Sequence, residues 1–209
     1  GAAREELVAQ IAKAKNKTPY QIALSELDFT QGRFDDAKVL LEGIIKQPSV
    51  PADANAARVK LAEMYLLQRD FKVATSMADQ VLSQDARNVA ALRIRATAKI
   101  ELGELEGAIN DARAALNDQP RSAELLTILG LAYERGGQIE LADKQLADAM
   151  RSSNFDPAVG LNYVTFLTRR GLREHAENVL TELVNRNPNN ANVLASMAQM
   201  KLNRRDWVA

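Results

Sequence analysis

The side chains that could do acid–base or nucleophilic chemistry are few in this chain. His175 is the only histidine, and there is no Cys. A single imidazole with no Ser, Cys or second His at a set spacing lacks the partners that general acid–base catalysis or a metal centre requires. The absence of Cys excludes disulfides, thiolate metal sites and cysteine nucleophiles. We therefore expect His175 to face solvent, and we expect no enzyme activity, no cofactor and no metal site.

Charged side chains also have structural explanations. Asp35 and Asp36 fall in the first turn of an expected helix, where negative charge complements the helix dipole. The pair Arg169–Arg170 falls at an expected helix C-terminus, where cations are favoured, so an RNA-binding patch is the weakest interpretation of it. Lys plus Arg equals Asp plus Glu, 27 of each. This balance argues against nucleic acid or an anionic membrane surface as the partner, and nothing indicates a small-molecule substrate.

The helical pattern that must position these residues is interrupted about every 17 residues by Gly, Pro, Asn and Asp, and from Arg69 onward the interruptions recur every 34 residues. The expected tight turns are at Gly32, Arg69, Gly103, Gly137, Gly171 and Arg205. Five residues after each of the first five comes an alanine: Ala37, Ala74, Ala108, Ala142 and Ala176. Seven residues before each turn stands a mostly small residue: Ser25, Ala62, Ala96, Gly130, Val164 and Ala198. Small residues let paired helices approach closely. The glycines follow this period and form no phosphate-binding loop.

Residue types that begin and end helices agree with the same spacing. Residues with a side-chain oxygen suited to an N-cap are Thr18, Asp53, Ser122, Asp156 and Asn190. Prolines that should end the second helix of a pair are Pro48, Pro120 and Pro188. We expect a large apolar residue two positions after each turn, as at Phe34, Phe71, Leu105, Ile139 and Trp207, and Arg173 is the exception.

These columns resemble the tetratricopeptide repeat family, a helix–turn–helix unit of 34 residues. Residues 89–122, 123–156 and 157–190 match best, and Tyr65 and Tyr133 stand where the family favours an aromatic residue. The early Trp of the family motif is missing from every unit, and Arg69 and Arg205 replace turn glycines. The resemblance implies an all-α fold, a right-handed α-solenoid of antiparallel helix hairpins with about 12 helices.

We expect one array over residues 1–209. It would comprise the second helix of a preceding unit at residues 2–15, five repeats at about 18–51, 55–88, 89–122, 123–156 and 157–190, and a partial repeat at 191–209. Neither end reads as a polar capping helix. We therefore expect a segment of a larger protein, with end-to-end self-association through the uncapped terminal repeats.

The resemblance implies that first helices line a concave surface that grips a partner segment. On helical geometry the candidate residues are Ile22, Glu26, Phe29, Val59, Glu63, Leu66, Leu67, Arg93, Thr97, Ile100, Glu101, Thr127, Leu131, Glu134, Arg135, Leu161, Thr165, Thr168, Arg169, Ala195, Gln199 and Leu202. In this hypothesis Phe29 and Leu66 are apolar anchors. Arg93, Arg135 and Arg169 would make polar contacts. The alternative is that each of these side chains packs on the next repeat or is simply solvated.

Chaperone-docking members of the family hold a C-terminal carboxylate with Lys and Asn on consecutive first helices. The corresponding positions here carry neither residue type: Ile22, Val59 and Arg93, paired with Glu26, Glu63 and Thr97. Two of the six are acidic and would repel a carboxylate, so we do not expect this chain to bind a chaperone C-terminus.

The leading hypothesis is a non-catalytic protein–protein interaction scaffold that binds a protein or peptide partner. Two alternatives remain open. The repeats could be a structural arm of a bacterial envelope assembly for secretion, pilus formation or polysaccharide export. They could also be a regulatory domain of an enzyme whose catalytic part lies elsewhere.

Overall fold

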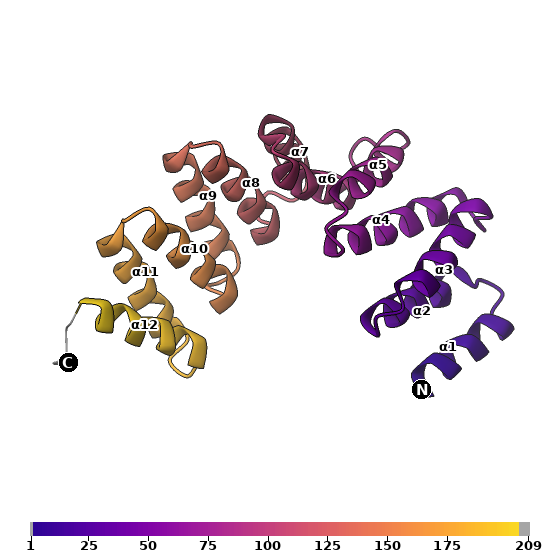
Figure 1. Ribbon diagram of the computed structural model, residues 1–209, viewed down its shortest axis with the longest axis horizontal. Coiled ribbons are helices and arrows are strands. Elements are labelled where there is room, and N and C mark those ends of the chain that lie inside the picture. The colour runs from indigo at the N-terminus through magenta and orange to yellow at the C-terminus, as the bar shows by residue number, and fades with distance from the viewer. Residues whose placement is uncertain (1, 205–209) are drawn as a thin grey trace. The chain divides into compact units, whose positions relative to one another are not determined.

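A computed structural model describes residues 2–204, with side chains as far as residue 202, and every regular element in this range is an α-helix (Figure 1). The helices are α1 (Ala2–Lys13), α2 (Thr18–Thr30), α3 (Phe34–Lys46), α4 (Pro51–Leu67), α5 (Phe71–Leu82), α6 (Val89–Leu102), α7 (Leu105–Asp118), α8 (Ala123–Arg135), α9 (Ile139–Ser152), α10 (Pro157–Arg169), α11 (Arg173–Arg186) and α12 (Ala191–Arg204). They form two compact units, residues 1–111 and 112–209. The all-α prediction is confirmed. The turn expected at Arg205 and the large residue Trp207 lie outside the described residues.

The turns inside the hairpins lie where the sequence predicts them. Gly32, Gly103, Gly137 and Gly171 adopt left-handed backbone angles, with φ between 74° and 81°. Such angles are accessible to glycine without steric cost. Arg69 adopts the same conformation (φ 63°) without being glycine. The 34-residue spacing therefore places the chain reversals correctly.

The alanine column forms the contacts within hairpins. All five of its members are fully buried: Ala37, Ala74, Ala108, Ala142 and Ala176. Two glycines allow even closer approach, because a Cβ on Gly130 would lie 2.8 Å from Cγ of Leu146, and a Cβ on Gly160 would lie 2.5 Å from Cδ2 of Leu183. These helices therefore approach as closely as their backbones and the facing leucines permit.

Three of the predicted N-caps are confirmed. The Ser122 hydroxyl accepts a hydrogen bond from the backbone N–H of Leu125. The Asp156 carboxylate caps α10 ahead of Pro157, and the Asn190 side chain accepts from two N–H groups at the start of α12. Each satisfies donors that a helix N-terminus leaves unpaired.

The predicted N-caps at Thr18 and Asp53 are wrong. Helix α4 begins at Pro51, earlier than expected, because proline is preset for the first helical turn. Asp53 therefore lies inside the helix and not in front of it. Thr18 is the first residue of α2 and caps nothing, since its hydroxyl donates instead to the Asp53 carboxylate at 2.8 Å. This bond joins the N-termini of α2 and α4.

Helix α1 is attached to the first unit through charge. None of its residues is buried. Arg4 on α1 donates to Asp28 at 3.0 Å, and Arg33 donates to the same oxygen at 2.5 Å. Asp28 is fully buried on α2, and its second carboxylate oxygen, Oδ2, has no hydrogen-bond partner among the described residues. Burial alone would raise the pKa of Asp28, but the hydrogen bonds and charges of the two arginines outweigh it and lower the pKa.

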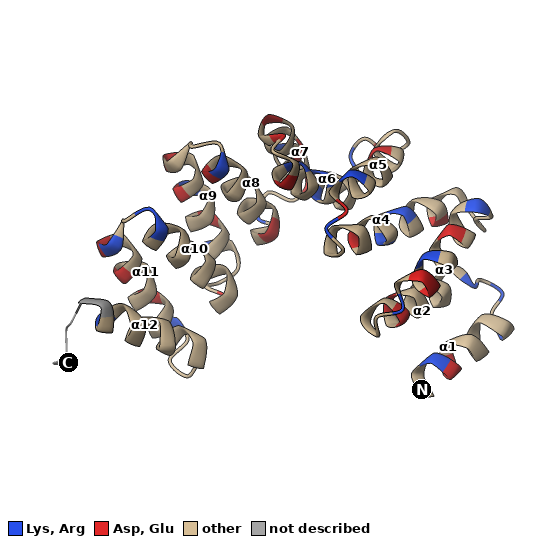
Figure 2. Cartoon of the chain, in the orientation of Figure 1, with Lys and Arg blue, Asp and Glu red and all other residues tan. Residues whose placement is uncertain are grey.

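Elsewhere on both units, basic and acidic positions are scattered among uncharged ones, and neither sign is confined to one helix (Figure 2). This mixture accords with the zero net charge of the chain.

Candidate partner-binding surface

The first helices of unit 1 carry a row of alternating charges. Lys60 on α4 lies 2.7 Å from Glu26 on α2 and 3.3 Å from Glu63, and Glu63 also pairs with Arg93 on α6. The hydrogen bond that the Lys60 ammonium donates to the Glu26 carboxylate is the chief cause of the raised pKa of Lys60. This row places the predicted residues Glu26, Glu63 and Arg93 together, but it pairs them with one another. A ligand on this face would have to compete with these ion pairs.

The apolar candidates of unit 1 lie mostly against its interior. Ile22 and Phe29 pack on the buried cluster that α3 and α4 share. Ile100 is only 2% exposed, so we exclude it from any partner-binding surface, whereas Leu67 is 72% exposed at the end of α4. The other candidates here are partly buried: Val59, Leu66, Thr97 and Glu101.

In unit 2, the candidate Glu134 is buried. Its side chain is 7% exposed and accepts hydrogen bonds from Arg169 at 3.0 Å and from Arg170 at 3.1 Å. The carboxylate thus joins α8 to the end of α10, and we exclude it from the partner-binding surface. Of the remaining candidates on α8, Arg135 is exposed, and Thr127 and Leu131 are partly buried.

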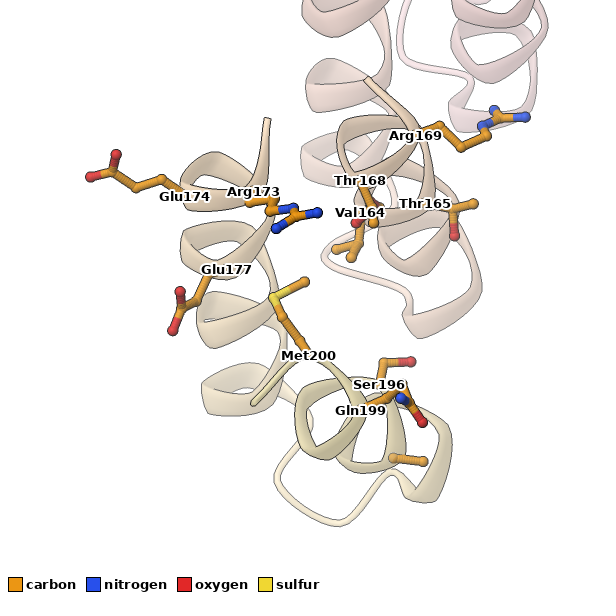
Figure 3. A pocket seen from close by; sticks show the side chains of 11 residues that line it. Val164, Thr165, Thr168, Arg169, Arg173, Glu174, Glu177, Ser196, Gln199 and Met200 are labelled. Atoms are coloured by element: carbon orange, nitrogen blue, oxygen red, sulfur yellow. The ribbon is translucent and has the colours of Figure 1, made fainter. Parts of the chain in front are cut away.

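An open groove lies between α10, α11 and α12, with a volume of about 1210 Å³ (Figure 3). Its α10 side consists of Val164, Thr165, Thr168 and Arg169. Its α11 and α12 sides consist of Arg173, Glu174, Glu177, Ala195, Ser196, Gln199 and Met200. We call this the α10–α12 groove. It brings together five of the candidates named from the sequence: Thr165, Thr168, Arg169, Ala195 and Gln199.

The sequence reasoning missed six groove residues, and for two of them a signal existed. Arg173 breaks the column of large apolar residues, and Val164 is the bulkiest member of the small column that reads Ser, Ala, Ala and Gly in the preceding repeats. No repeat column singles out the other four, which were not among the predicted residues: Glu174, Glu177, Ser196 and Met200. Their access depends on how far α12 stands from α10 and α11, which no local pattern specifies.

The side chains around His175 form a structural cluster. The Tyr163 hydroxyl donates to Asp143 at 2.8 Å, and the His175 ring lies edge-on to the Tyr163 ring at 5.8 Å between centroids. Burial, together with the bond to Asp143, raises the pKa of Tyr163, so its phenol stays protonated at neutral pH. His175 is about half exposed, as the sequence suggested, but one ring edge is packed.

The described residues also bear on metal binding and on membrane insertion. No group of three or more His, Cys, Asp or Glu side chains in them is placed to hold a metal ion. No helix between residues 2 and 204 has both the length and the hydrophobicity that crossing a membrane would need.

Comparisons with known proteins agree on the architecture. A sequence profile described as tetratricopeptide repeat matches residues 22–89 and 95–157. No curated protein sequence matches the chain significantly.

Solved structures are similar in fold. The thermophilic tetratricopeptide repeat protein TTC0263 of Thermus thermophilus is 19% identical, with a TM-score of 0.70 over 88% of this chain and 99% of that one. Pseudomonas aeruginosa pilF is 20% identical, with a TM-score of 0.71 over 97% of this chain and 86% of that one. YrrB, described as having an unusual peptide-binding site, is 16% identical, with a TM-score of 0.60 over 92% of this chain and 98% of that one.

Proposed function

Because the chain belongs to the tetratricopeptide repeat family, whose profile matches more than half of its residues, we propose that it binds a segment of a partner protein in the α10–α12 groove. Repeats of this family serve in general as protein–protein interaction scaffolds. The location of the binding site in this chain is inferred from the chemistry of the groove residues and not from the fold.

The observation that carries the proposal is the size and lining of the groove. Its volume of about 1210 Å³ exceeds the roughly 300–1,000 Å³ of a typical small-molecule pocket. It is not an enclosed cavity, so an extended or helical segment could enter it from solvent. Apolar surface from Ala195 and Met200, beside the almost fully buried Val164, adjoins hydroxyl and charged groups. Such a mixture supplies both buried area and orientation for a polypeptide.

The first-helix face of unit 1 supports the proposal less well. Its charged side chains are already paired in the row from Glu26 to Arg93, and two of its apolar candidates pack on the core. In the α10–α12 groove, by contrast, Thr165 and Ala195 are exposed side chains with open space in front of them. A ligand there displaces solvent and breaks fewer existing contacts.

A selection experiment tests this proposal without knowledge of the natural partner. Short random peptides displayed on phage are selected on the chain, and the binding of the recovered peptides is then measured on two matched variants. Ala195→Trp fills the groove with a bulky neutral side chain. Ala191→Trp places the same side chain on the same helix outside the groove, since Ala191 is exposed and does not line it.

We expect the recovered peptides to lose binding to Ala195→Trp and to keep it on Ala191→Trp. Recovered peptides that bind both variants as well as they bind the original chain would show that the α10–α12 groove is not the binding surface. If no peptides are recovered from the library, the binding function itself is contradicted. The alternative hypothesis, that the repeats are a structural arm of a bacterial envelope assembly, would then be favoured.

A further inference from the structure

Arg173 occupies a position at which the other repeats place a large apolar residue. Two residues after the turn stand Phe34, Phe71, Leu105 and Ile139, and all four are partly buried. Arg173 is exposed at the corresponding place in α11. An apolar side chain here would serve packing, so the arginine gives up packing and gains a charge at the groove. An arginine at this repeat position is better explained by binding to a ligand in the groove than by packing.

The guanidinium of Arg173 extends into the groove. Figure 3 shows it directed toward Val164 of α10 and Met200 of α12, whereas Glu174 and Glu177 project away from both. The structure records no hydrogen bond or ion pair for Arg173 among the residues it describes. Arg169, the other groove arginine, is already bonded to Glu134 at 3.0 Å. Arg173 therefore supplies the cation that faces a bound segment.

The hydroxyl groups near Arg173 donate hydrogen bonds within their own helices. Thr165 and Thr168 each donate to a backbone carbonyl four residues earlier, and Ser196 does the same. Their protons are thus not offered to a ligand. An acidic group in the groove would be held mainly by the planar fork of Arg173, whose geometry matches a carboxylate.

The charge count favours a peptide carboxylate over a nucleic acid. A phosphate backbone is held by several cations along its length. Here the lining holds two arginines, of which Arg169 is already paired with Glu134, and two glutamates on the α11 rim, so a run of phosphates would meet as many negative as positive groups. A single carboxylate beside Arg173, with apolar neighbours on Val164 and Met200, suits the arrangement better.

We propose that Arg173 is a specificity-determining residue of the α10–α12 groove, and that it binds an aspartate or glutamate side chain of the partner segment next to an apolar residue that contacts Met200. This inference rests on the proposed function and adds the chemistry of the partner. The carboxylate is an internal side chain of the segment and not a chain terminus.

The same phage selection tests the inference, since peptides fused to the coat protein at their C-terminus carry no free C-terminal carboxylate. Selections are run in parallel on the original chain, on Arg173→Gln, on Arg173→Glu, and on Arg121→Glu. Arg121 is an exposed arginine of the same unit outside the groove, so it controls for the general effect of reversing a charge. The best peptide is then remade with its acidic residue replaced by the matching amide.

We expect an acidic residue to be enriched in peptides from the original chain and from Arg121→Glu, but not from the two Arg173 variants. The amide peptide should bind the original chain about tenfold more weakly. It should bind Arg173→Gln no more weakly than the acidic peptide does.

Peptides that are blocked by Ala195→Trp but show no acidic enrichment would overturn this inference and leave the proposed function standing. Peptides indifferent to Ala195→Trp would overturn both. An acidic preference that survives Arg173→Gln would also overturn the assignment to Arg173.

Discussion

The contact between α10 and α11 at Gly160 gives a stability prediction whose sign is opposite to that of an ordinary helical glycine. Replacing glycine with alanine inside a helix usually stabilises a protein, by roughly 0.5–1 kcal/mol. Gly43 in α3 fits that case, because it is exposed and a Cβ there meets nothing within 4 Å. We expect Gly43→Ala to raise the free energy of unfolding by about that amount.

At Gly160 the new methyl group would overlap Leu183. Its Cβ would lie 2.5, 2.6 and 2.9 Å from three Leu183 carbons, where ordinary contact is 3.4–4 Å. Leu183 is fully buried, so a shift of its side chain would disturb its packing against other neighbours. Overpacking of this kind costs about 1–3 kcal/mol. After the helix-propensity gain of about 0.5–1 kcal/mol is subtracted, Gly160→Ala should lower the free energy of unfolding by up to about 2.5 kcal/mol.

Chemical denaturation followed by circular dichroism at the helix band measures both variants. A third comparison isolates the overlap: in a Leu183→Ala background, Gly160→Ala should become neutral or stabilising, since the clashing atoms are gone. If Gly160→Ala stabilises the chain as much as Gly43→Ala does, α10 and α11 do not approach as closely as described. The small-residue explanation of the hairpin would then be incorrect.

Two further predictions test the charged anchor of α1 and the alanine column. Asp28→Asn should destabilise unit 1 by roughly 1.5–3 kcal/mol and expose the α1 amides to hydrogen exchange, since it removes the charged hydrogen-bond acceptor of two partly exposed arginines. Because the pKa of Asp28 is lowered in the folded state, the stabilisation that its charge provides is present above the unfolded pKa and is lost as the pH falls below about 4. Unchanged hydrogen-exchange protection of α1 in Asp28→Asn would contradict the role of Asp28 in holding α1. Ala108→Leu should lower the free energy of unfolding by about 1–3 kcal/mol, measured by thermal or chemical denaturation, because Ala108 is fully buried. Gln119→Leu, at an exposed position, should change it little. Equal effects of the two substitutions would contradict the repeat alignment.

The helices and their turns follow closely from the sequence because they depend on local spacing. A turn glycine such as Gly137 and a crossing alanine such as Ala142 recur at fixed intervals, and each fixes its own hairpin. The failure at Asp53 also has a local cause. Pro51 starts α4 earlier, so the expected cap became part of the helix.

The candidate surface follows less closely because it depends on the neighbouring repeat. Helical geometry assigns Glu134 to an exposed face, but Arg169 and Arg170 come from the next repeat and cover it. Met200 was not among the residues predicted from the sequence, yet it lines the groove between α10, α11 and α12. Distances between helices of adjacent repeats are set by many side chains at once, and spacing along one helix does not encode them.

The most direct test of the central claim is nuclear magnetic resonance of isotope-labelled methionine methyl groups, with a selected peptide added to the full chain. Of the five methionines, Met200 lines the α10–α12 groove, whereas Met64 belongs to the buried cluster of unit 1 and Met77 packs against that cluster. Binding in the groove should shift the Met200 signal most and leave the signals of Met64 and Met77 in place. A peptide that binds, shifts Met64 or Met77 and leaves Met200 unchanged would contradict the account.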